Sequence, residues 1–303
     1  MQAGEESASA RSYVVGGVEI PARPLAPALY LVATPIGNLA DITLRALETL
    51  AGADVLACED TRVTRVLLGR YGIRQRPTPY HEHNAAEAGP RLIEALETGR
   101  SVALVSDAGT PLVSDPGYRL VEEALARGLK IIPVPGPSSV LAALAGSGLP
   151  TDTFLFAGFL PVKGGQRRAR LEELRAVPAT LIFFESPRRL ADTLSAMAGV
   201  YGDRPAVIGR ELTKAFEEFR RGSLPELAAH YEGADTPKGE VVLCVGPPAA
   251  AAPGATDIDA MLRSLAEEMP ASKAAAEAAR LTGQPKGDLY RRLLELKESG
   301  GGR

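Results

Sequence analysis

Short runs of β-branched and aliphatic residues alternate with longer amphipathic stretches along the first half of the chain. The apolar runs predict strands at 28–34, 53–58, 101–106 and 130–135. The stretches with helical spacing predict helices at 43–51, 62–69, 85–98, 117–127 and 138–146. Strands that are apolar on both faces need cover on both sides. This order therefore predicts a mostly parallel sheet between two layers of helices.

The second half of the chain repeats the alternation in a different form. Its apolar runs predict strands at 153–158, 179–185, 205–211 and 240–246. The segment 214–223, KAFEEFRRGS, alternates between apolar and polar residues, which is typical of an antiparallel strand that leads to a turn. The predicted fold class is α/β, with a mostly parallel N-terminal sheet, a mixed C-terminal sheet and a small helical tail.

Breaks in the pattern divide the chain into four parts. The polar start predicts a flexible tail over 1–27. The glycine- and proline-containing segment at 146–152 separates an N-terminal α/β domain, 28–147, from a second one, 148–247. The alanine- and proline-rich segment after it opens a linker and helical tail over 248–303. The tail's helical patterns predict either a helix-turn-helix or a small helical appendage.

The composition is that of an average globular protein, with 45% apolar residues, 23% charged residues and a net charge of -3. This charge gives no global sign of nucleic-acid binding, although a local basic face could still provide it. Cys58 and Cys244 lie in apolar runs, which predicts two reduced, buried thiols. The sequence has no membrane-length apolar run and no signal-peptide core, so we expect a cytoplasmic protein without a membrane partner.

Several common chemistries lack their motifs. The turn after the first strand of the sheet reads ATPIGN, where a dinucleotide-binding fold would have G-x-G-x-x-G, and the sequence has no P-loop motif. The segment GPSSV begins like the nucleophile elbow of a hydrolase, but Val140 replaces the second glycine. His81 and His83 could supply two metal ligands, yet no Cys or His spacing supplies the others, so we expect no metal site.

Small residues, prolines and acids gather where the predicted strands end. The segments are TPIGN (34–38), EDTR (59–62), SDAGTP (106–111), PGPSS (135–139), ESPRR (185–189) and RELTK (210–214). Parallel strands bring their carboxyl ends to one edge of a sheet, and ligands bind there. One such loop is explained by turn chemistry, but six together predict a binding site.

These loops also limit the class of ligand. Glycines and prolines let the backbone approach a ligand closely, whereas the acids at 106–117 disfavour a polyphosphate and suit hydroxyl, amine or cationic groups. An adenine or a thioether could be enclosed by Leu112, Val113, Phe183 and Phe184. S-adenosylmethionine combines an adenine, ribose hydroxyls, an ammonium and a sulfonium. It therefore fits the loops, although other ligands would fit them too.

The same segments resemble the ribosomal RNA small subunit methyltransferase I family, which belongs to the tetrapyrrole methylase superfamily. The resemblance runs from about Leu29 to Val245 and is carried above all by TPIGNLADIT, EDTR, SDAGTPLVSDPG, VPGPSS, FFESPRR, GRELTKAFEE and KGEVVL. It implies a two-domain, tetrapyrrole-methylase-like fold and a homodimer. It also implies that S-adenosylmethionine is the methyl donor for 2′-O-methylation of a cytidine ribose in the decoding region of 16S ribosomal RNA. Tetrapyrrole-methylating relatives typically have a GGDP-like sequence where this chain has SDAG, which favours the RNA branch.

The resemblance carries over to particular residues of the donor site. SDAGTP matches the family's glycine-rich donor loop and PGPSS matches the next one. The implied donor-binding residues are Pro35, Ser106, Asp107, Ala108, Gly109, Thr110, Ser138, Ser139, Phe184 and Gly239. The second half of the first loop has a simpler interpretation, because Asp115 stands where an aspartate caps the helix that begins near Gly117.

A ribose hydroxyl is a poor nucleophile at neutral pH, so a positioned base should take its proton. The candidates at strand ends are Glu59, Asp60, Glu185, Glu211 and Lys214. We single out Glu59, Asp60 and Lys214. A neutral lysine would accept the proton, whereas a charged one would stabilise the developing alkoxide. For the two acids, an ion pair with Arg62 or Arg65 is the structural alternative.

Binding to ribosomal RNA needs cations that contact phosphates. The basic run KGGQRRAR contributes Arg167, Arg168 and Arg170, and Arg62 and Arg65 lie near the predicted cleft. Each of these arginines could instead belong to a solvated helix face. Two other functions stay open from sequence: methylation of a tetrapyrrole or another small molecule, and RNA binding without catalysis by an assembly factor.

Overall fold

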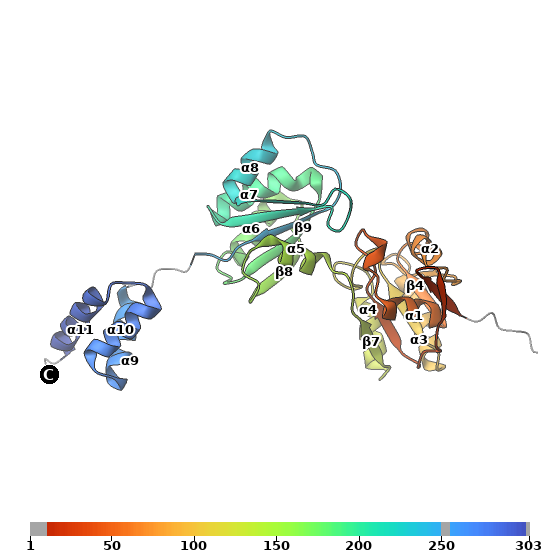
Figure 1. The fold of residues 1–303 in the computed structure, drawn as a ribbon, viewed down its shortest axis with the longest axis horizontal. Helices are drawn as coiled ribbons and strands as arrows, with labels where there is room; N and C mark the ends of the chain where they lie inside the picture. Colours follow the sequence, from red (N-terminus) through yellow and green to blue (C-terminus); the bar gives the residue numbers. More distant parts are fainter. Residues whose placement is uncertain (1–10, 250–254, 301–303) are drawn as a thin grey trace, which may run out of the picture. The chain divides into compact units, whose positions relative to one another are not determined.

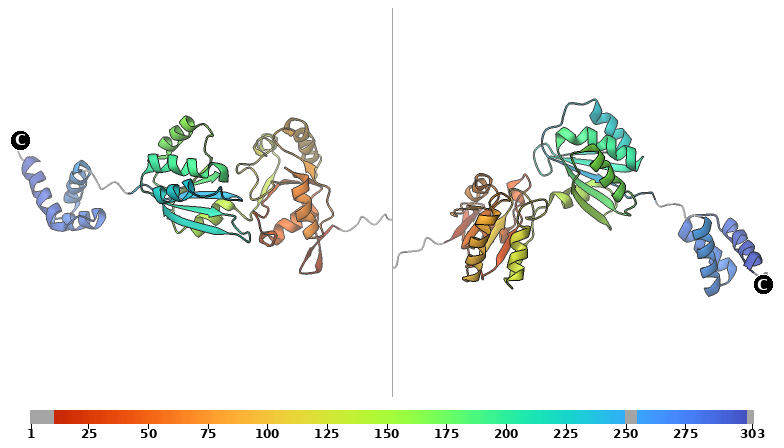
Figure 2. Two further views of the ribbon diagram at one scale, coloured as in Figure 1. Left: turned by 90° about the horizontal axis from the view of Figure 1, so that it is seen from above. Right: turned by 180° about the vertical axis from the view of Figure 1, so that it is seen from behind.

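The computed structural model describes residues 11–249 and 255–300 (Figures 1 and 2). It divides into two compact units, Met1–Pro247 and Pro248–Arg303. The first unit contains two five-stranded sheets and a two-stranded hairpin, and the second contains helices only. Among the described residues, no helix is both long enough and apolar enough to cross a bilayer.

The N-terminal sheet is parallel throughout, and its strand order is β5-β4-β6-β3-β7. Its strands are β3 (Leu29–Val32), β4 (Val55–Cys58), β5 (Thr78–Pro79), β6 (Val102–Val105) and β7 (Ile131–Val134). Its helices are η1 (Leu39–Asp41), α1 (Leu44–Gly52), α2 (Thr61–Arg70), α3 (Ala85–Glu97) and α4 (Tyr118–Ala126). Leu29 and Leu104 point toward α3 and α4, whereas Tyr30 and Val105 point toward α1 and α2. The predicted parallel sheet between two helical layers is therefore confirmed.

A hairpin precedes this sheet and packs against it. Its strands are β1 (Ser12–Val15) and β2 (Val18–Pro21), joined by Gly16 and Gly17 with φ values of 59° and 83°. Such positive φ angles suit a two-residue turn between twisted strands. Tyr13 is buried in the core beneath α1 and α2. The predicted flexible tail is therefore wrong for residues 12–21, because a short alternating run gains its stability only from a core that lies elsewhere in the sequence. Residues 1–10 lie outside the described part.

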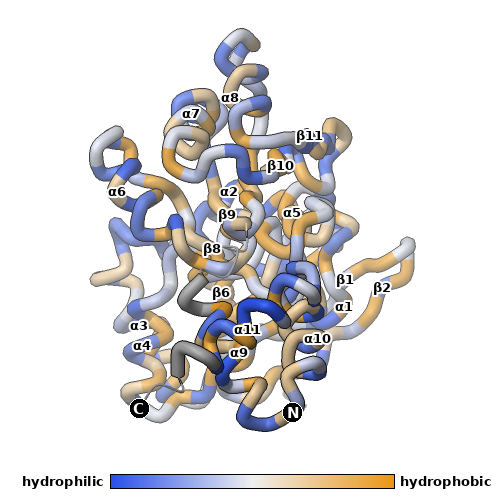
Figure 3. Tube along the Cα trace, turned by 90° about the vertical axis from the view of Figure 1, so that its left-hand side faces the viewer, coloured by the Kyte–Doolittle hydropathy of each residue, from blue (hydrophilic) through white to orange (hydrophobic). Residues whose placement is uncertain are grey.

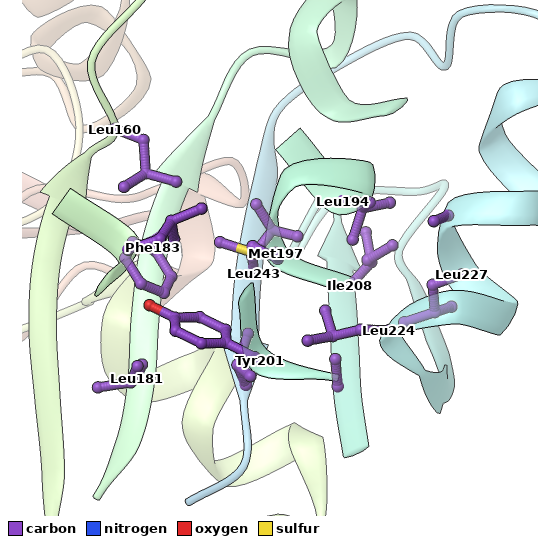
Figure 4. Close-up of a cluster of buried hydrophobic side chains, with 14 of the residues drawn as sticks. Leu160, Leu181, Phe183, Leu194, Met197, Tyr201, Ile208, Leu224, Leu227 and Leu243 are labelled. Atoms are coloured by element: carbon purple, nitrogen blue, oxygen red, sulfur yellow. The ribbon is translucent and has the colours of Figure 1, made fainter. Parts of the chain in front are cut away.

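The second sheet is mixed, as predicted, with strand order β11-β10-β12-β9-β8. Only the β8–β9 pair in this sheet is parallel, and the other pairs are antiparallel. The strands are β8 (Phe154–Phe159), β9 (Thr180–Glu185), β10 (Pro205–Arg210), β11 (Glu218–Ser223) and β12 (Val241–Val245). The helices over one face are α6 (Gly164–Leu174), η2 (Pro187–Arg189), α7 (Leu190–Tyr201) and α8 (Leu224–Glu232). Phe183, Leu243 and Tyr201 lie at the centre of this core (Figure 4).

Helix α5 (Ser139–Ser147) covers the other face of the second sheet and packs on β10, β11 and β12. Its Val140, Ala143 and Leu144 are buried against Val207 and Cys244. The predicted boundary between 147 and 148 therefore falls one helix too late. Helical periodicity identified the apolar residues of α5, but periodicity carries no information on which of two sheets a helix covers.

The second unit is a bundle of α9 (Ala255–Glu268), α10 (Ala271–Thr282) and α11 (Lys286–Gly300). Leu262, Ala275 and Leu293 belong to its own buried core. Gly283 ends α10 in the left-handed conformation, with a φ of 71°. Hydrophilic and hydrophobic segments alternate along this unit's helices, as expected for helices that bury one face (Figure 3).

Candidate functional site

Two loops at the carboxyl edge of the N-terminal sheet are joined directly. The backbones of Thr34, after β3, and Gly109, after β6, exchange hydrogen bonds of 2.8 and 3.0 Å. Gly109 has a φ of 76°, which glycine adopts without strain. The Thr34 hydroxyl also donates to the carbonyl of Ser106 at 3.3 Å. The strand-end loops of β3 and β6 therefore meet at this edge, as the sequence predicts.

A cleft of about 370 Å³ opens beside these loops, and strand-end loops of both sheets line it. The predicted donor residues that line this cleft are Ala108, Gly109, Thr110, Ser138, Ser139, Phe184 and Gly239. Pro35, Ser106 and Asp107 line an adjoining hollow of about 340 Å³ instead. The structure thus brings most of the predicted donor residues together and places these three beside them.

Phe184 forms part of an apolar wall of the cleft. Its ring makes T-shaped contacts with Phe156 and Phe159, at centroid distances of 4.7 and 5.6 Å. Val113 also lines the cleft, as expected, but Phe183 is fully buried in the core on the other face of the sheet. The expectation for Phe183 is therefore wrong, because successive residues of a strand point to opposite faces. The sequence alone did not single out the other apolar residues of the wall, which include Ile36, Leu212 and Val242.

Backbone groups provide much of the polar lining. Ser138 caps α5, and its hydroxyl accepts a hydrogen bond from the Leu141 N–H at 3.4 Å. The N-terminus of this helix therefore opens at the cleft, where the helix dipole favours a negative group. Gly239 has a φ of 97°, and a Cβ there would overlap the carboxyl group of Glu211. These features together fit S-adenosylmethionine: the apolar wall suits its adenine, the helix N-terminus suits its carboxylate, and the backbone without a side chain allows close approach.

The loop after β6 holds an uncommon backbone conformation. Leu112 and Ser114 have positive φ values of 73° and 66°, which cost a non-glycine residue on the order of 1 kcal/mol each. Helix α4 begins after Gly117 without a side-chain capping bond. The prediction that Asp115 caps this helix is therefore wrong. Asp115 lines the cleft, and its carboxyl hydrogen-bonds with the hydroxyl of Ser106.

Carboxyl groups are concentrated near this loop. Burial raises the pKa of Asp115, and the neighbouring charge of Asp107 raises it further, against the effect of the hydrogen bond from Ser106. Burial likewise raises the pKa of Glu59, followed by the charges of Asp107 and Asp115. Asp107 Oδ1 accepts the backbone N–H of Asp60 at 2.9 Å and so ties the β6 loop to the β4 loop.

Asp60 has a structural role in this arrangement. It caps α2 and accepts the Arg62 N–H at 2.7 Å, and its carboxylate pairs with the Arg62 guanidinium at 2.6 Å. These bonds lower the pKa of Asp60 to about 2. A carboxylate held in this way is a poor proton acceptor near pH 7. The ion pair with Arg62, the alternative that the sequence left open, is thus formed.

Glu59 and Asp60 do not line the donor cleft. They border a separate hollow of about 470 Å³, together with Asp107, His81 and His83. The imidazole rings of the two histidines meet edge to face at 6.0 Å. Among the residues that the structure describes, no three His, Cys, Asp or Glu side chains are arranged to hold a metal ion.

Lys214 is held in a network of ion pairs at the end of β10. Its Nζ lies 2.8 Å from Glu211 and 3.0 Å from Glu240. Burial lowers the pKa of Lys214, but the hydrogen bonds to Glu211 and Glu240 more than offset this, so the pKa is raised overall. Lys214 is therefore a charged ammonium, which argues against its use as a neutral base.

Glu185 lines the cleft but is fully engaged inside the second domain. Its carboxylate accepts bonds from the Ser186 N–H at 2.8 Å and the Thr193 hydroxyl at 2.7 Å. It also forms an ion pair with Arg189 at 3.0 Å, and its side chain is buried. These contacts orient η2 beside the cleft and leave Glu185 little capacity to bind a further proton donor.

The predicted RNA-binding arginines differ in whether their guanidinium groups already have a partner within the protein. Arg65 and Arg168 are exposed on α2 and α6. Arg167 donates to the Thr193 hydroxyl at 3.1 Å, and Arg170 pairs with Glu173 at 2.7 Å. Arg62 is committed to Asp60, as described above. The basic run on α6 therefore presents less free charge than its sequence indicates.

Comparison with known proteins agrees with this site. The family described as Tetrapyrrole (Corrin/Porphyrin) Methylases matches residues 28–228, and the RsmI C-terminal HTH domain matches residues 252–297. The chain is 72% identical to a ribosomal RNA small subunit methyltransferase I of Mesorhizobium japonicum, over 95% of this chain and 98% of that protein. It is 52% identical to one of Erythrobacter litoralis, over 91% of this chain and 98% of that protein.

Solved structures share the fold at lower identity. A diphthine synthase has a TM-score of 0.58 and 20% identity, covering 72% of this chain and 90% of that one. A uroporphyrin-III C-methyl transferase from Thermus thermophilus, complexed with S-adenyl homocysteine, has a TM-score of 0.51 and 21% identity, covering 72% and 96%. From the extent and identity of the match to the curated relatives, the chain belongs to the ribosomal RNA small subunit methyltransferase I family, within the tetrapyrrole methylases.

Proposed function

We propose that the protein transfers a methyl group from S-adenosylmethionine to the 2′-hydroxyl of a cytidine ribose in the decoding region of 16S ribosomal RNA. The observation that carries the proposal is that the loops SDAGTP and PGPSS, which mark the family resemblance, line one cleft. The identity to curated ribosomal RNA methyltransferases along nearly the whole chain supports the same activity. The protein would act in the cytoplasm on the small subunit, and the homodimer implied by the resemblance stays a prediction.

The donor would bind along the wall that the two loops form. Backbone at Ala108, Gly109 and Thr110 would follow one side of the ligand, while Phe184 would pack against its adenine. Gly239 would let the chain pass close to it. When bound, S-adenosylmethionine supplies an electrophilic methyl group on a sulfonium. The chain's contribution is to align this group with the acceptor and to exclude water.

The other predicted donor residues would support this wall from behind. Ser106 and Asp107 brace the β6 loop through contacts with Thr34 and Asp60. Pro35 lies in the hollow next to the cleft. Ser138 and Ser139 would bring the N-terminus of α5 to the donor carboxylate. This assignment predicts that substitutions at Ser106 and Asp107 weaken donor binding indirectly, through loop geometry.

RNA binding would rest on cations outside the cleft. Arg65 and Arg168 have exposed side chains that can contact phosphates without first breaking an ion pair. Arg62, Arg167 and Arg170 would need to exchange their present partners for phosphate. The match of the second unit to a helix-turn-helix domain adds a further candidate surface for RNA.

One experiment separates the possible activities. The protein is incubated with labelled methyl donor and, separately, with unmethylated small subunits, naked 16S ribosomal RNA and tetrapyrrole precursors, and any methylated nucleotide is mapped. We expect a single 2′-O-methylated cytidine in the decoding region. Methylation of a tetrapyrrole instead would overturn the proposed acceptor. RNA binding without transfer to any acceptor would identify a non-catalytic assembly factor.

A further inference from the structure

Asp115 stands between two recesses of the first unit. It lines the donor cleft and also a second recess of about 460 Å³, which is bordered by Tyr118, Arg119 and His83. Among the described residues, Asp115 alone belongs to the lining of both. A group at such a junction can reach a donor on one side and an acceptor on the other.

The second recess has groups that suit a nucleotide. Tyr118 is 67% exposed, so its ring is open to stacking against a base. Arg119 is exposed beside it and can pair with a phosphate. His83 adds a hydrogen-bonding ring at the rim. The hollow that Lys214 lines, which also adjoins the cleft, is instead bordered by apolar residues of α2, among them Val63 and Val66.

The other carboxylates that line the donor cleft are already committed. Glu185 is saturated by Arg189 and by hydrogen bonds within its own domain. Glu240 is paired with Lys214. Asp115 has no cation within ion-pair distance among the described residues, and its carboxyl interacts with the Ser106 hydroxyl. Asp115 is thus the carboxylate in the cleft whose oxygens are most available to a hydroxyl.

We propose that Asp115 is the catalytic base that accepts the proton of the acceptor 2′-hydroxyl, an inference that rests on the proposed function. The hydroxyl oxygen bonds to the methyl carbon, and the carbon–sulfur bond breaks with its electron pair remaining on sulfur. The hydroxyl proton passes to a carboxylate oxygen of Asp115, from which water later removes it. The positive φ values of Leu112 and Ser114 indicate that the surrounding structure holds the loop that carries this carboxylate in one conformation.

The surroundings of Asp115 suit this role near neutral pH. Burial and the charge of Asp107 raise the pKa of Asp115, which makes its carboxylate a better proton acceptor than an exposed aspartate, and the hydrogen bond with Ser106 opposes part of this shift. The other ionisable groups that border its two recesses are Glu185 and Glu240 in the donor cleft, and Tyr80, Glu82, His83, Tyr118 and Arg119 in the second recess.

The test compares Asp115→Asn and Asp115→Glu with the wild-type protein, using methyl transfer to unmethylated small subunits. We expect Asp115→Asn to lower kcat by about 10²- to 10⁴-fold, because a general base contributes an effect of that size. Donor affinity, measured by calorimetry, should change little. The wild-type kcat should rise with pH through a carboxyl titration that Asp115→Asn lacks and that Asp115→Glu partly restores.

Asp203→Asn is the matched control, because Asp203 is exposed and lies outside the cleft. Its kcat should equal that of the wild type. If the wild-type protein methylates small subunits and Asp115→Asn keeps its kcat within about threefold, the proposal for Asp115 is overturned and the proposed function stands. Weaker donor binding with unchanged kcat would also overturn it, because Asp115 would then be a donor ligand. If the wild type transfers no methyl group to small subunits, the proposed function fails and the proposal fails with it.

Discussion

The two domains of the first unit both contribute loops with carboxyl groups to the region of the cleft. The loops differ in whether a cation pairs with the carboxyl group. In the N-terminal domain, the β6 loop holds Asp115 near Asp107 without a neutralising cation among the described residues. In the second domain, the loop after β10 holds Glu211 in an ion pair with Lys214. One loop keeps a carboxylate available for proton exchange, whereas the other uses its carboxylate to fix a lysine.

Backbone strain occurs in both loops. Leu112 and Ser114 in the β6 loop have positive φ values, and so do Glu211 and Thr213 after β10. In the second loop, the Thr213 N–H donates to Glu217 at 2.6 Å, which helps to stabilise the turn. Strain therefore indicates that both loops are held in place by their surroundings. The partners of each carboxylate, and not the strain, distinguish a reactive loop from a structural one.

The largest effect that we expect on stability comes from Gly239→Ala. This substitution tests whether the second domain needs a residue without a side chain where its backbone lines the cleft. The new Cβ would overlap the Glu211 side chain at a φ of 97°, so the free energy of unfolding should fall by about 2–3 kcal/mol and donor affinity should weaken. Urea denaturation and calorimetry measure the two effects.

Gly199→Ala is the control for this substitution. Gly199 lies within α7, and an added Cβ would meet no atom within 4 Å. It should raise stability by about 0.5–1 kcal/mol through helix propensity. Equal responses of the two glycine variants would contradict the inferred close approach at Gly239.

Lys214→Met breaks the ion-pair network of the second domain. The substitution leaves the partly exposed Glu211 carboxylate without its cation, so the free energy of unfolding should fall by about 1–2 kcal/mol. This loss is smaller than the one expected when a fully buried ion pair is broken. Arg91→Met removes a pair with Glu87 in which both side chains are 75% exposed, and it should change stability by less than about 0.5 kcal/mol. If Lys214→Met lowers the free energy of unfolding no more than Arg91→Met does, the ion-pair network does not stabilise the fold.

Asp115→Asn should change the free energy of unfolding less than Gly239→Ala or Lys214→Met does. Those two substitutions should lower stability, whereas Asp115→Asn should raise it. A carboxyl whose pKa is raised on folding makes the native state bind more protons than the unfolded chain. Native stability therefore falls as pH rises from the unfolded pKa, about 3.9, through the raised folded value. The variant should gain stability relative to the wild type between about pH 4 and pH 7. Thermal unfolding at both pH values measures this, and a loss of stability at pH 7 would argue for a structural role.

The smallest effects that we expect come from single arginines on the two domains. Arg65→Glu and Arg168→Glu should each weaken binding to small subunits about threefold at low salt and less at high salt, because each removes a free phosphate contact. Arg170→Gln should change affinity less, since Arg170 is paired with Glu173. Affinities measured by filter binding over a salt series would contradict this ranking if Arg170 proved the most sensitive.

Much of the site could be predicted from sequence because its loops are continuous segments. SDAGTP and PGPSS each end a predicted strand, and the structure brings Ala108, Gly109 and Ser139 from these loops to one cleft. The apolar wall was harder to predict. Ile36 and Leu212 lie in the predicted loops TPIGN and RELTK, but the local sequence does not show that these two apolar side chains face the ligand.

Local sequence patterns do not predict which side chains meet in three dimensions. Asp115 stands in the sequence where a helix cap would stand, but the twisted loop turns its carboxyl into the cleft. Asp60 and Lys214 have the chemistry of proton acceptors, yet their partners Arg62 and Glu211 fix their charges. Pairing partners are set by the packing of loops from different strands, which spacing along the chain does not specify.

By itself, the sequence determined the α/β class, the main strands of both sheets and the loops that carry the chemistry, but it did not predict the β1–β2 hairpin. These features follow from hydrophobic periodicity and turn residues, which act over a few neighbouring positions. The tertiary structure alone decided that α5 covers the second sheet, that Phe184 rather than Phe183 faces the cleft, and that Asp115 has no cationic partner among the described residues. Burial and charge pairing depend on residues far apart in the chain, so only the folded molecule fixes them.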